Sequence, residues 1–290
     1  MTTFREPAPA KINLTLEVAG RRADGLHALA SLVAFADVGD TVTLDLEREP
    51  GVSVSGPFAD RLVGANILDQ VLSSVQERAP HLRLGAVHLV KDLPVAAGVG
   101  GGSADAGALL RALKCANSSE RASVDWAALA RGLGADVPVC FDAQAAWMTG
   151  SGAALSKVAG GVPVLDAVLV NPQADVPADK TAQVFRALAA PPLPSDYAVP
   201  PPPAFRDRED ALAFMRARGN DLAEAAAVVV PEVREVLDAL GRAGDVQYVA
   251  LSGAGPTAFG VFPDAVTAER ACALLSDAHP DWWCRTVRLG

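Results

Sequence analysis

The chain has 290 residues, of which 50% are hydrophobic, 20% charged and 5% aromatic. This composition is typical of a soluble globular protein with an aliphatic core, and the length allows one large domain or two ordinary ones. The formal net charge of −9 argues against a general nucleic-acid surface or an anionic-membrane surface. Any binding of phosphate groups must therefore depend on local positive groups.

Cysteine spacing and hydropathy together indicate the cellular compartment. The first residues contain no apolar signal core, and no stretch approaches the roughly 18 uninterrupted apolar residues of a membrane-spanning helix. The cysteines show no C-x-x-C spacing, which disfavours a zinc knot or a redox pair. We expect a cytoplasmic protein with reduced thiols at Cys115, Cys140, Cys272 and Cys284.

Residues 10–18 alternate between apolar and polar side chains, the period-2 pattern of a half-buried strand. Lys11, Asn13 and Thr15 share the polar face, which by itself would be an ordinary solvated face. The turn that follows contains two arginines and His27. A single loop histidine is usually a surface hydrogen-bonding group, and the histidines of this chain show no metal-ligand spacing.

Several further elements precede a glycine-rich loop. Residues 29–35 and 40–46 are predicted to form two strands, and residues 66–78 carry apolar side chains at helical spacing. Pro80 ends this predicted helix. The apolar run 86–93 is predicted to be the strand that leads into the loop.

The glycine-dense loop, 94–105, is followed directly by a helical pattern over 104–114. A strand, a glycine loop and a helix offer backbone N–H groups and the positive end of a helix dipole to an anion, most often a phosphate. A Walker A loop is excluded because no lysine lies between Lys91 and Lys114, and a dinucleotide fingerprint needs a glycine where Ser103 stands. We interpret the loop as a cradle for a nucleotide triphosphate; the alternative is a flexible turn capped by Ser103.

Residues 126–133 are predicted to form a short helix that ends at Gly134. Asp136 follows at a predicted helix-to-strand junction, with an apolar run directly behind it. A carboxylate buried there would need a partner, whereas in the simpler interpretation Asp136 only organises a turn. Residues 147–152 predict another tight turn, at a sheet edge or the mouth of a pocket.

The composition changes after about residue 156. Strands are predicted at 162–171, 248–251, 257–262 and 283–289, and helices at 179–189, 209–217, 221–229, 233–243 and 265–278. The proline-rich stretch 191–203 is expected to be an extended, poorly restrained surface loop. Residues 252–256 form a second glycine turn, which is either a plain hairpin or a segment that closes over a nucleotide. The irregular mixture of strands and helices predicts an α+β protein with two domains, 1–156 and 157–290.

Taken together, these motifs resemble those of the GHMP small-molecule kinases. The loop is similar to their phosphate signature P-x-x-x-G-x-G-x-x-S, and residues 252–257 are similar to their C-terminal glycine motif. The stretches 9–16, 20–27, 98–106, 133–139 and 220–222 resemble most closely the members that phosphorylate a diphosphocytidyl alcohol. The resemblance implies a two-domain α+β GHMP kinase fold with an N-terminal ribosomal-S5-like domain, a C-terminal ferredoxin-like α/β sandwich and the active site between them.

The resemblance also implies an ATP-dependent phosphotransfer and assigns Lys11 and Asp136 as the catalytic pair. Asp136 would accept the proton of the substrate hydroxyl, and Lys11 would keep the aspartate ionised and stabilise the transferring phosphoryl group. Mg²⁺ would neutralise part of the phosphate charge, through ligands that the sequence does not identify. ATP would be held by Pro94, Val95, Ala96, Ala97, Gly98, Val99, Gly100, Gly101, Gly102, Ser103 and Ala104.

The substrate side of the site is also implied by the resemblance. Asn13, His27, Thr181 and Phe185 would face the diphosphocytidyl group, with His27 reading the cytosine edge and Phe185 covering its ring. Members of the family usually have an aromatic residue immediately before this histidine, where this chain has Leu26. Another side chain would then have to supply the stacking platform for the base.

Other functions stay open at this point. A GHMP kinase acting on homoserine, mevalonate or a sugar would share most of the motifs, and a non-catalytic nucleotide-binding regulator could have the same fold. The presence of both Lys11 and Asp136 argues against the regulator. The excess of acidic over basic residues, with a formal net charge of −9, disfavours an RNA-binding module. We therefore expect small-molecule partners, no nucleic acid or membrane partner, and a monomer or weak homodimer.

Overall fold

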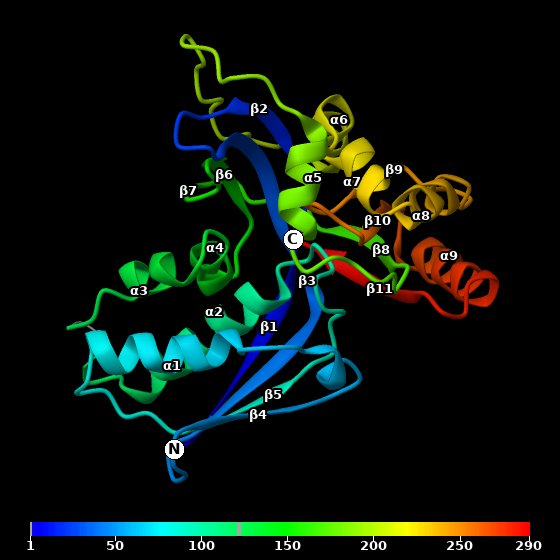
Figure 1. The fold of residues 1–290 in the computed structure, drawn as a ribbon. Helices are drawn as coiled ribbons and strands as arrows, with labels where there is room; N and C mark the ends of the chain where they lie inside the picture. Colours follow the sequence, from blue (N-terminus) through cyan, green and yellow to red (C-terminus); the bar gives the residue numbers. More distant parts are fainter. Residues whose placement is uncertain (1, 121–122) are drawn as a thin grey trace. The chain divides into compact units, whose positions relative to one another are not determined.

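The computed structural model describes residues 2–120 and 123–290, and it divides the chain into two compact units (Figure 1). Unit 1 comprises Met1–Ala10, Val38–Val95 and Gly100–Gln144, and unit 2 comprises Lys11–Asp37, Ala96–Val99 and Ala145–Gly290. Each unit is therefore built from segments that are far apart in the sequence. Two strands, β1 (Thr3–Asn13) and β3 (His27–Asp45), contribute to both units.

The sheet of unit 1 combines the second half of β3 with β5 (Ala86–Val90) and β4 (Gly51–Ser55). β5 pairs antiparallel with β3, with Thr43 opposite His88, and parallel with β4. The unit also contains a 3₁₀ turn, η1 (Ala59–Arg61), and the helices α1 (Ile67–Arg78), α2 (Gly101–Ala116), α3 (Trp126–Leu133) and α4 (Val137–Asp142). Helix α2 packs against the other three helices, and α1 also contacts β4.

Helix α1 confirms the prediction of a helix over 66–78. The Asn66 side chain caps it by accepting a hydrogen bond of 3.0 Å from the Leu68 N–H, which satisfies one of the free amides of the first turn. Its buried side chains recur at helical spacing and include Val71 and Val75. The apolar stripe in the sequence is therefore the face that α1 packs against the rest of unit 1.

The prediction of separate strands at 29–35 and 40–46 is wrong, because both belong to the single strand β3. Residues 36–39, which lie between the two predicted runs, continue the strand. Gly39 permits a close approach, since a Cβ there would lie 2.3 Å from the Ala8 carbonyl oxygen. Asp40 stays in the strand because its buried carboxylate accepts hydrogen bonds from the backbone N–H groups of Asp92 and Leu93.

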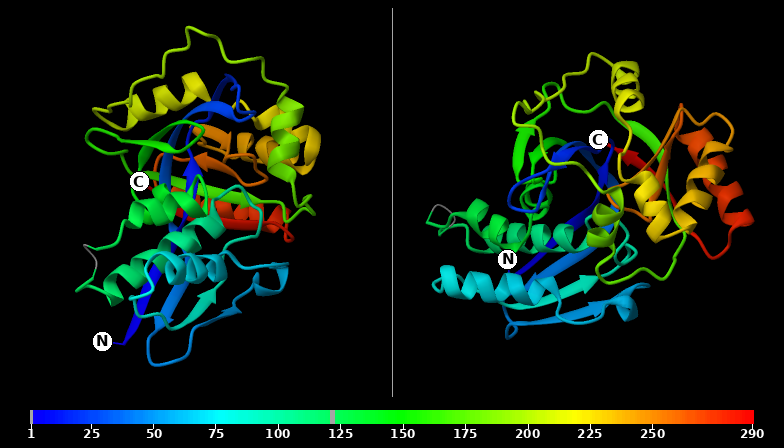
Figure 2. Two further views of the ribbon diagram at one scale, coloured as in Figure 1. Left: turned by 60° about the vertical axis from the view of Figure 1, so that its left-hand side comes forward. Right: turned by 45° about the horizontal axis from the view of Figure 1, so that its top comes forward.

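The sheet of unit 2 has the antiparallel order β11-β8-β10-β9. Its strands are β8 (Leu165–Asn171), β9 (Tyr248–Leu251), β10 (Ala258–Val261) and β11 (Trp283–Leu289). Helices α8 (Glu232–Gly241) and α9 (Ala265–Ala278) pack on this sheet, and the two views of Figure 2 show the orange-red α9 alongside the red β11. Three further helices complete the unit: α5 (Lys180–Leu188), α6 (Arg208–Arg218) and α7 (Ala223–Val229).

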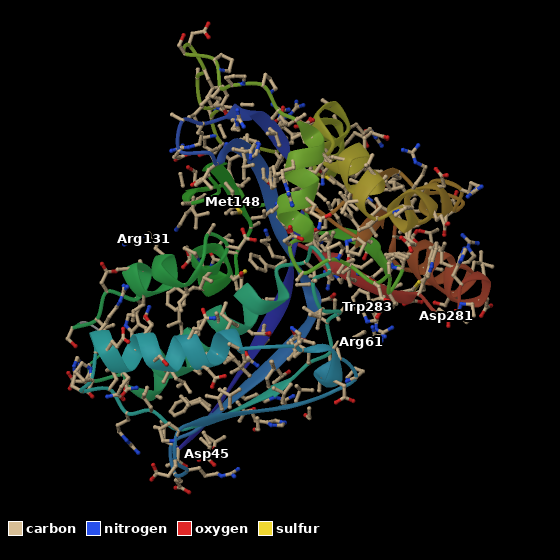
Figure 3. All side chains as sticks on the ribbon, in the orientation of Figure 1. Asp45, Arg61, Arg131, Met148, Asp281 and Trp283 are labelled. Atoms are coloured by element: carbon tan, nitrogen blue, oxygen red, sulfur yellow. The ribbon has the colours of Figure 1, made fainter. Side chains whose placement is uncertain are left out.

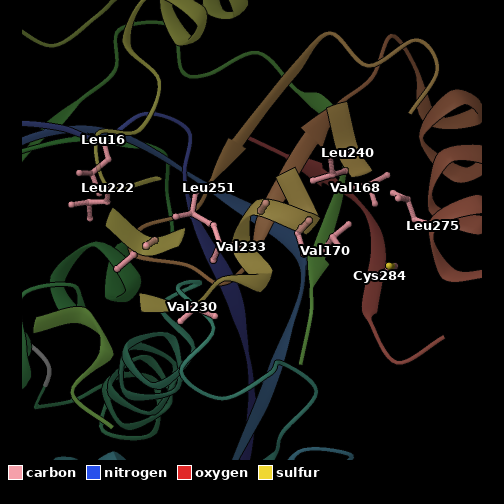
Figure 4. Close-up of a cluster of buried hydrophobic side chains, with 14 of the residues drawn as sticks. Leu16, Val168, Val170, Leu222, Val230, Val233, Leu240, Leu251, Leu275 and Cys284 are labelled. Carbon is pink, nitrogen blue, oxygen red and sulfur yellow. The ribbon is translucent and has the colours of Figure 1, made fainter. Parts of the chain in front are cut away.

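The core of unit 2 lies between this sheet and its helices. Val168 and Val170 of β8 pack with Val233 and Leu240 of α8 and with Leu275 of α9 (Figure 4). All of these side chains are buried, and so are the aromatic and sulfur-containing side chains of Trp283 in β11 and Met148, which are labelled in Figure 3. This packing accounts for the apolar runs that predicted strands at 162–171 and 283–289.

Unit 2 contains three shorter strands: the first two pair with the first half of β3, and the third pairs with the second. They are β2 (Glu17–Arg21), β6 (Ala146–Gly150) and β7 (Ala154–Lys157). The predicted turn at 147–152 is confirmed only at its end, where the Gly152 N–H donates to the Thr149 carbonyl in the hairpin between β6 and β7, because residues 147–150 belong to β6. The predicted strand 10–18 is not continuous, because β1 ends at Asn13 and β2 begins at Glu17.

The proline-rich segment 191–203 has no helix or named strand and is largely exposed, but it is not poorly restrained. The backbone of Arg21 donates to the Pro191 carbonyl at 2.7 Å and accepts from the Leu193 N–H at 2.8 Å. The indole N–H of Trp147 donates to the Pro200 carbonyl at 3.0 Å. The expectation of a poorly restrained loop is therefore wrong. Carbonyl and N–H groups of the segment form hydrogen bonds with Arg21 and Trp147, which are distant in the sequence.

No helix among residues 2–120 and 123–290 is long and apolar enough to cross a membrane.

Candidate functional site

The glycine-dense loop is divided between the two units. Pro94 and Val95 end one segment of unit 1, residues 96–99 belong to unit 2, and residues 100–104 begin the next segment of unit 1. In unit 2, four successive carbonyl oxygens of this loop accept hydrogen bonds. The donors are Lys180 Nζ to Ala96 (3.0 Å), Thr257 N to Ala97 (3.0 Å), Ser252 Oγ to Gly98 (3.0 Å) and Lys11 N to Val99 (2.9 Å).

This pattern matters because a carbonyl oxygen repels an anion whereas a backbone N–H attracts it. A segment whose carbonyl oxygens are all engaged by other donors is suited to bind an anion through its N–H groups. Segment 96–99 has this property within unit 2 alone. It therefore supports the interpretation of the loop as a phosphate cradle over that of a flexible turn.

The second glycine turn, 252–256, is both a hairpin and a partner of the loop. It joins β9 to β10, with Leu251 opposite Ala258, as the hairpin interpretation predicted. It also packs directly on Gly98, where a Cβ would lie 2.6 Å from the carbonyl oxygens of Ser252 and Gly255. Gly98 has φ +81°, so both its backbone conformation and its surroundings require glycine. At Gly98 the space of a side chain is thus filled by the turn.

Lys11 and Asn13 lie two residues apart on the same face of β1, the face that was predicted to be solvated. Both are buried, with exposed fractions of 4% and 5%, so the prediction of a half-buried strand is wrong. Asn13 N–H donates to Ser252 Oγ at 3.2 Å, and its side-chain amide donates to Ser31 Oγ at 2.7 Å. Segment 96–99 and the 252–256 turn therefore both hydrogen-bond to this part of β1 within unit 2, through the backbone N–H groups of Lys11 and Asn13.

The four predicted substrate residues all lie in unit 2. The rings of His27 and Phe185 stack, with their centroids 4.6 Å apart and an angle of 23° between their planes. Thr181 lies one turn before Phe185 on α5, on the same side of the helix. Burial, and secondarily the charge of Arg21, lowers the pKa of His27, which favours a neutral imidazole that can both donate and accept hydrogen bonds.

Unit 1 contains the rest of the loop at the start of α2. The helix begins at Gly101, three residues earlier than predicted, and its N-cap is Gly100 with φ +65°. Ser103 therefore lies in the first turn, and no side chain caps the helix. The first amides of α2 and the positive end of its dipole are directed at this end of the loop. Ser103 therefore does not cap the helix, and the alternative interpretation of a turn capped by Ser103 is wrong on this point.

A buried ionic cluster, which the sequence did not reveal, holds the two ends of the loop within unit 1. The ammonium of Lys91 lies 2.5 Å from Asp40 Oδ2 and 2.9 Å from Asp105 Oδ2, and all three side chains are buried. Burial and the neighbouring charge of Asp40 raise the pKa of Asp105 to about 8, although Lys91 opposes this shift. Burial lowers the pKa of Lys91, but the two carboxylates outweigh it and the net direction is upward.

Asp136 is placed by the packing of α4 on α2. It lies at the N-cap position of α4 and is partly exposed. The prediction of a helix-to-strand junction is wrong, because the apolar run behind Asp136 forms this short helix. Gly107 of α2 lets the two helices approach, since a Cβ there would lie 2.6 Å from the Cys140 backbone. Arg111 of α2 then donates to the carbonyls of Cys140 and Phe141.

Among the residues that the structure describes, no group of three or more His, Cys, Asp or Glu side chains could hold a metal ion. Mg²⁺ typically keeps several waters and binds through one or two carboxylates and substrate phosphates. An ATP-bound Mg²⁺ therefore needs no cluster of this kind.

Comparison with known proteins identifies the class of protein that this fold and these loops define. Residues 66–144 match the family model for the N-terminal domain of GHMP kinases, and residues 203–280 match the model for their C-terminal domain. The chain is therefore a GHMP kinase with the predicted fold class. The predicted domain boundary near residue 156 falls between the two matched ranges and stays a prediction.

Similar full-length proteins define the family more closely. The chain is 44% identical to the 4-diphosphocytidyl-2-C-methyl-D-erythritol kinase of Methylobacterium radiotolerans over 98% of both chains. It is also 44% identical to the enzyme of the same name from Dinoroseobacter shibae, over 95% of this chain and 91% of the other. The chain belongs to the family of 4-diphosphocytidyl-2-C-methyl-D-erythritol kinases.

Solved structures agree with this assignment. A crystal structure of 4-(cytidine 5'-diphospho)-2C-methyl-D-erythritol kinase matches 99% of this chain and all of its own, with a TM-score of 0.75 and 31% identity. Homoserine kinase from Cytophaga hutchinsonii matches 99% of the chain with a TM-score of 0.66 but only 17% identity. The second likeness shows the common fold alone.

Proposed function

We propose that this kinase transfers the γ-phosphoryl group of ATP to the 2-hydroxyl of 4-diphosphocytidyl-2-C-methyl-D-erythritol, giving the 2-phosphate and ADP. This reaction belongs to the non-mevalonate route to isopentenyl diphosphate. The observation that supports the nucleotide site most directly is the engagement of the four carbonyl oxygens of segment 96–99. A cytoplasmic location and a monomer or weak homodimer belong to the same proposal.

Phosphoryl transfer has a loose transition state, so the protein mainly positions the reactants and stabilises negative charge. The N–H groups of the loop and the start of α2 would hold the β- and γ-phosphates. Mg²⁺ would enter with ATP and neutralise part of the phosphate charge. The side chains proposed below then act on the γ-phosphoryl group and on the substrate hydroxyl.

We assign Lys11 to the transferring phosphoryl group. Its backbone N–H donates to the Val99 carbonyl, so this residue is fixed to the loop segment that would hold the phosphates. Lys11 is also buried, which strengthens the interaction of its ammonium with a phosphate oxygen because water screens it less. Its role would be to stabilise negative charge as the bond to the leaving ADP breaks.

We assign Asp136 to the substrate hydroxyl. It lies in the same unit as the start of α2, and it is partly exposed and therefore accessible to a ligand. An alcohol is far less acidic than a carboxylic acid, so proton transfer to Asp136 would occur late in the reaction. Orienting the hydroxyl for attack would be as important as accepting its proton.

The diphosphocytidyl group would be recognised by Asn13, His27, Thr181 and Phe185. His27 and Phe185 form a stacked pair. Leu26, which stands where relatives usually have an aromatic residue, is 54% exposed and offers no π-face. The stacked pair would therefore supply the aromatic surface for the cytosine, and the neutral His27 imidazole would hydrogen-bond its edge.

The experiment is an assay of ADP release with ATP and Mg²⁺, comparing 4-diphosphocytidyl-2-C-methyl-D-erythritol with homoserine, mevalonate and galactose. The Asp136→Asn variant serves as the blank. Turnover with the cytidyl alcohol alone, lost in the variant, supports both substrate and site. Turnover with another alcohol would overturn the substrate, and no turnover with any of the four would favour a non-catalytic nucleotide-binding regulator.

A further inference from the structure

Lys180 is a buried lysine outside the set of residues that the motifs point to. It is the first residue of α5, only 4% of its surface is exposed, and burial lowers its pKa to about 8. Its ammonium donates to the carbonyl oxygen of Ala96 at 3.0 Å and also to that of Gly255. A single side chain thus links the glycine loop to the second glycine turn, and both belong to unit 2.

The setting of Lys180 differs from that of Lys91, another of the deeply buried lysines described above. Lys91 faces two carboxylates in unit 1, which compensate its charge. The acceptors of Lys180 among the described residues are backbone carbonyls, which carry only partial charges. Keeping an ammonium buried without a carboxylate costs free energy, so a role beyond packing is needed to explain this residue.

Lys180 is also the one charged donor among the four side-chain or backbone groups that bind the carbonyls of segment 96–99. The other three donors are a hydroxyl and two backbone N–H groups. In a trans peptide the C=O and N–H bonds point in opposite directions. Holding the Ala96 carbonyl toward Lys180 therefore turns the N–H of Ala97 the other way.

We propose that Lys180 is a positioning residue for nucleotide binding, whose ammonium holds Ala96 and Gly255 together and adds positive charge behind the segment that presents N–H groups to the phosphates of ATP. The inference rests on the proposed function in one respect, the assignment of segment 96–99 to the nucleotide. It does not depend on which alcohol is phosphorylated. Lys180 itself would act through the loop and not on the reacting atoms.

The test compares Lys180→Met, which has a similar length but no charge or donor, with Lys180→Arg, which keeps both. Lys157→Met, an exposed lysine in β7 of the same unit, is the matched control. The first measurement is amide hydrogen exchange without nucleotide. We expect faster exchange in peptides covering 94–104 and 250–258 for Lys180→Met, and wild-type exchange in the control.

The second measurement is the affinity for the non-hydrolysable analogue β,γ-imido-ATP, together with KM for ATP and kcat. We expect affinity to fall and KM to rise at least about tenfold in Lys180→Met, with kcat within about threefold, because a hydrogen bond from a charged group is lost. Lys180→Arg should recover part of the affinity. A merely structural residue would not show this split. Its loss would lower the amount of folded protein, and with it the apparent kcat, but would leave KM for ATP unchanged.

The outcomes separate this inference from the proposed function. Unchanged exchange at both loops in Lys180→Met overturns the link between them, and unchanged analogue affinity overturns the role in nucleotide binding. If Lys180→Met fails to fold, the arginine variant decides: exchange and affinity close to wild type support the inference, and a tenfold loss of affinity in folded Lys180→Arg overturns it. Failure of the wild type to phosphorylate the cytidyl alcohol changes neither the hydrogen exchange nor the affinity for β,γ-imido-ATP, because neither needs an acceptor.

Discussion

The ammonium of Lys91 lies 2.9 Å from a carboxylate oxygen of Asp105, and this buried ion pair joins the strand end before the glycine loop to the helix after it. Asp40 completes the cluster from β3 and also accepts two backbone hydrogen bonds near Lys91. Removing the lysine would leave two carboxylates buried side by side. Removing the charge of Asp105 would leave an ordinary pair of Lys91 and Asp40.

We therefore expect Lys91→Met to lower the free energy of unfolding by about 3–5 kcal/mol, the usual cost of leaving buried charge without its partner. Asp105→Asn should cost much less, about 1 kcal/mol, because burial and the neighbouring Asp40 raise the pKa of Asp105 and so disfavour its charged form, and because the Lys91–Asp40 ion pair remains. Denaturant unfolding measures both. Arg234→Met, which breaks an exposed ion pair with Glu224, is the control. Equal costs for the Lys91 and Asp105 variants would contradict this account.

Much of the fold could be predicted from local patterns. The helix 265–278 and the strands 248–251 and 283–289 were predicted with the bounds that the structure has, because their apolar periodicity and turn residues agree. The motif residues were found because each lies in a contiguous stretch. Thus the glycine loop and the segment around Asp136 could be recognised without any tertiary information.

The supporting residues could not be found in this way. Lys180 is 84 residues from Ala96, and Lys91 is 51 residues from Asp40. No local sequence pattern can therefore predict either contact. Burial of the polar face of β1 depends equally on distant loops that cover it. Deeply buried lysines are rare unless paired, and a lysine at the start of a helix is far more often exposed. Only the tertiary structure distinguishes Lys180 from those.

The two reasons for glycine at position 98 can be separated by a matched pair of variants. Gly98 has φ +81° and a Cβ there would lie 2.6 Å from two backbone oxygens, whereas Gly25 has φ +84° with nothing within 4 Å. Gly25→Ala should cost only the strain of the left-handed conformation, about 1 kcal/mol. Gly98→Ala adds a backbone clash and should cost at least about 2 kcal/mol more, with a rise in KM for ATP. Equal unfolding free energies would show that the loop and the turn do not pack as described.

The buried Lys180 should leave a signature in the pH dependence of stability. Its pKa is lowered from 10.5 to about 8 in the folded protein, so between these values the unfolded state binds more protons and stability rises with pH. The stabilisation is complete above the unfolded pKa and is lost as the pH falls through about 8. The whole effect corresponds to about 3 kcal/mol.

This prediction is tested by the difference between wild type and Lys180→Met in unfolding free energy from pH 7 to 10.5. The difference is needed because burial raises the pKa of Cys284 to about 11 and also raises that of Tyr248, and both groups make stability fall with rising pH. Those effects are common to the two proteins and cancel. A difference that stays constant across this range would mean that Lys180 is not perturbed by burial.

The stacked pair of His27 and Phe185 predicts how the base is bound. Phe185→Ala should raise KM for the diphosphocytidyl substrate by about 5- to 150-fold, which corresponds to a stacking contribution of about 1–3 kcal/mol, while KM for ATP changes little. Leu26→Tyr should lower KM for the same substrate, because Leu26 is exposed and a ring there would add a second π-face. Steady-state kinetics with each substrate varied in turn provides the measurement. An increase in KM in Leu26→Tyr would place the base elsewhere.

The proposed role of Asp136 predicts that its substitution lowers turnover without weakening nucleotide binding. Asp136→Asn keeps the size of the side chain but removes the base and the charge that orients the hydroxyl, so kcat should fall by about 10²- to 10⁴-fold. KM for ATP should stay within about threefold of wild type, because the loop and α2 bind the phosphates. Asp142→Asn, at the exposed end of the same helix α4, is the control and should leave kcat unchanged. A fall of less than about tenfold in Asp136→Asn, equivalent to roughly 1.4 kcal/mol, would assign the proton transfer to another group.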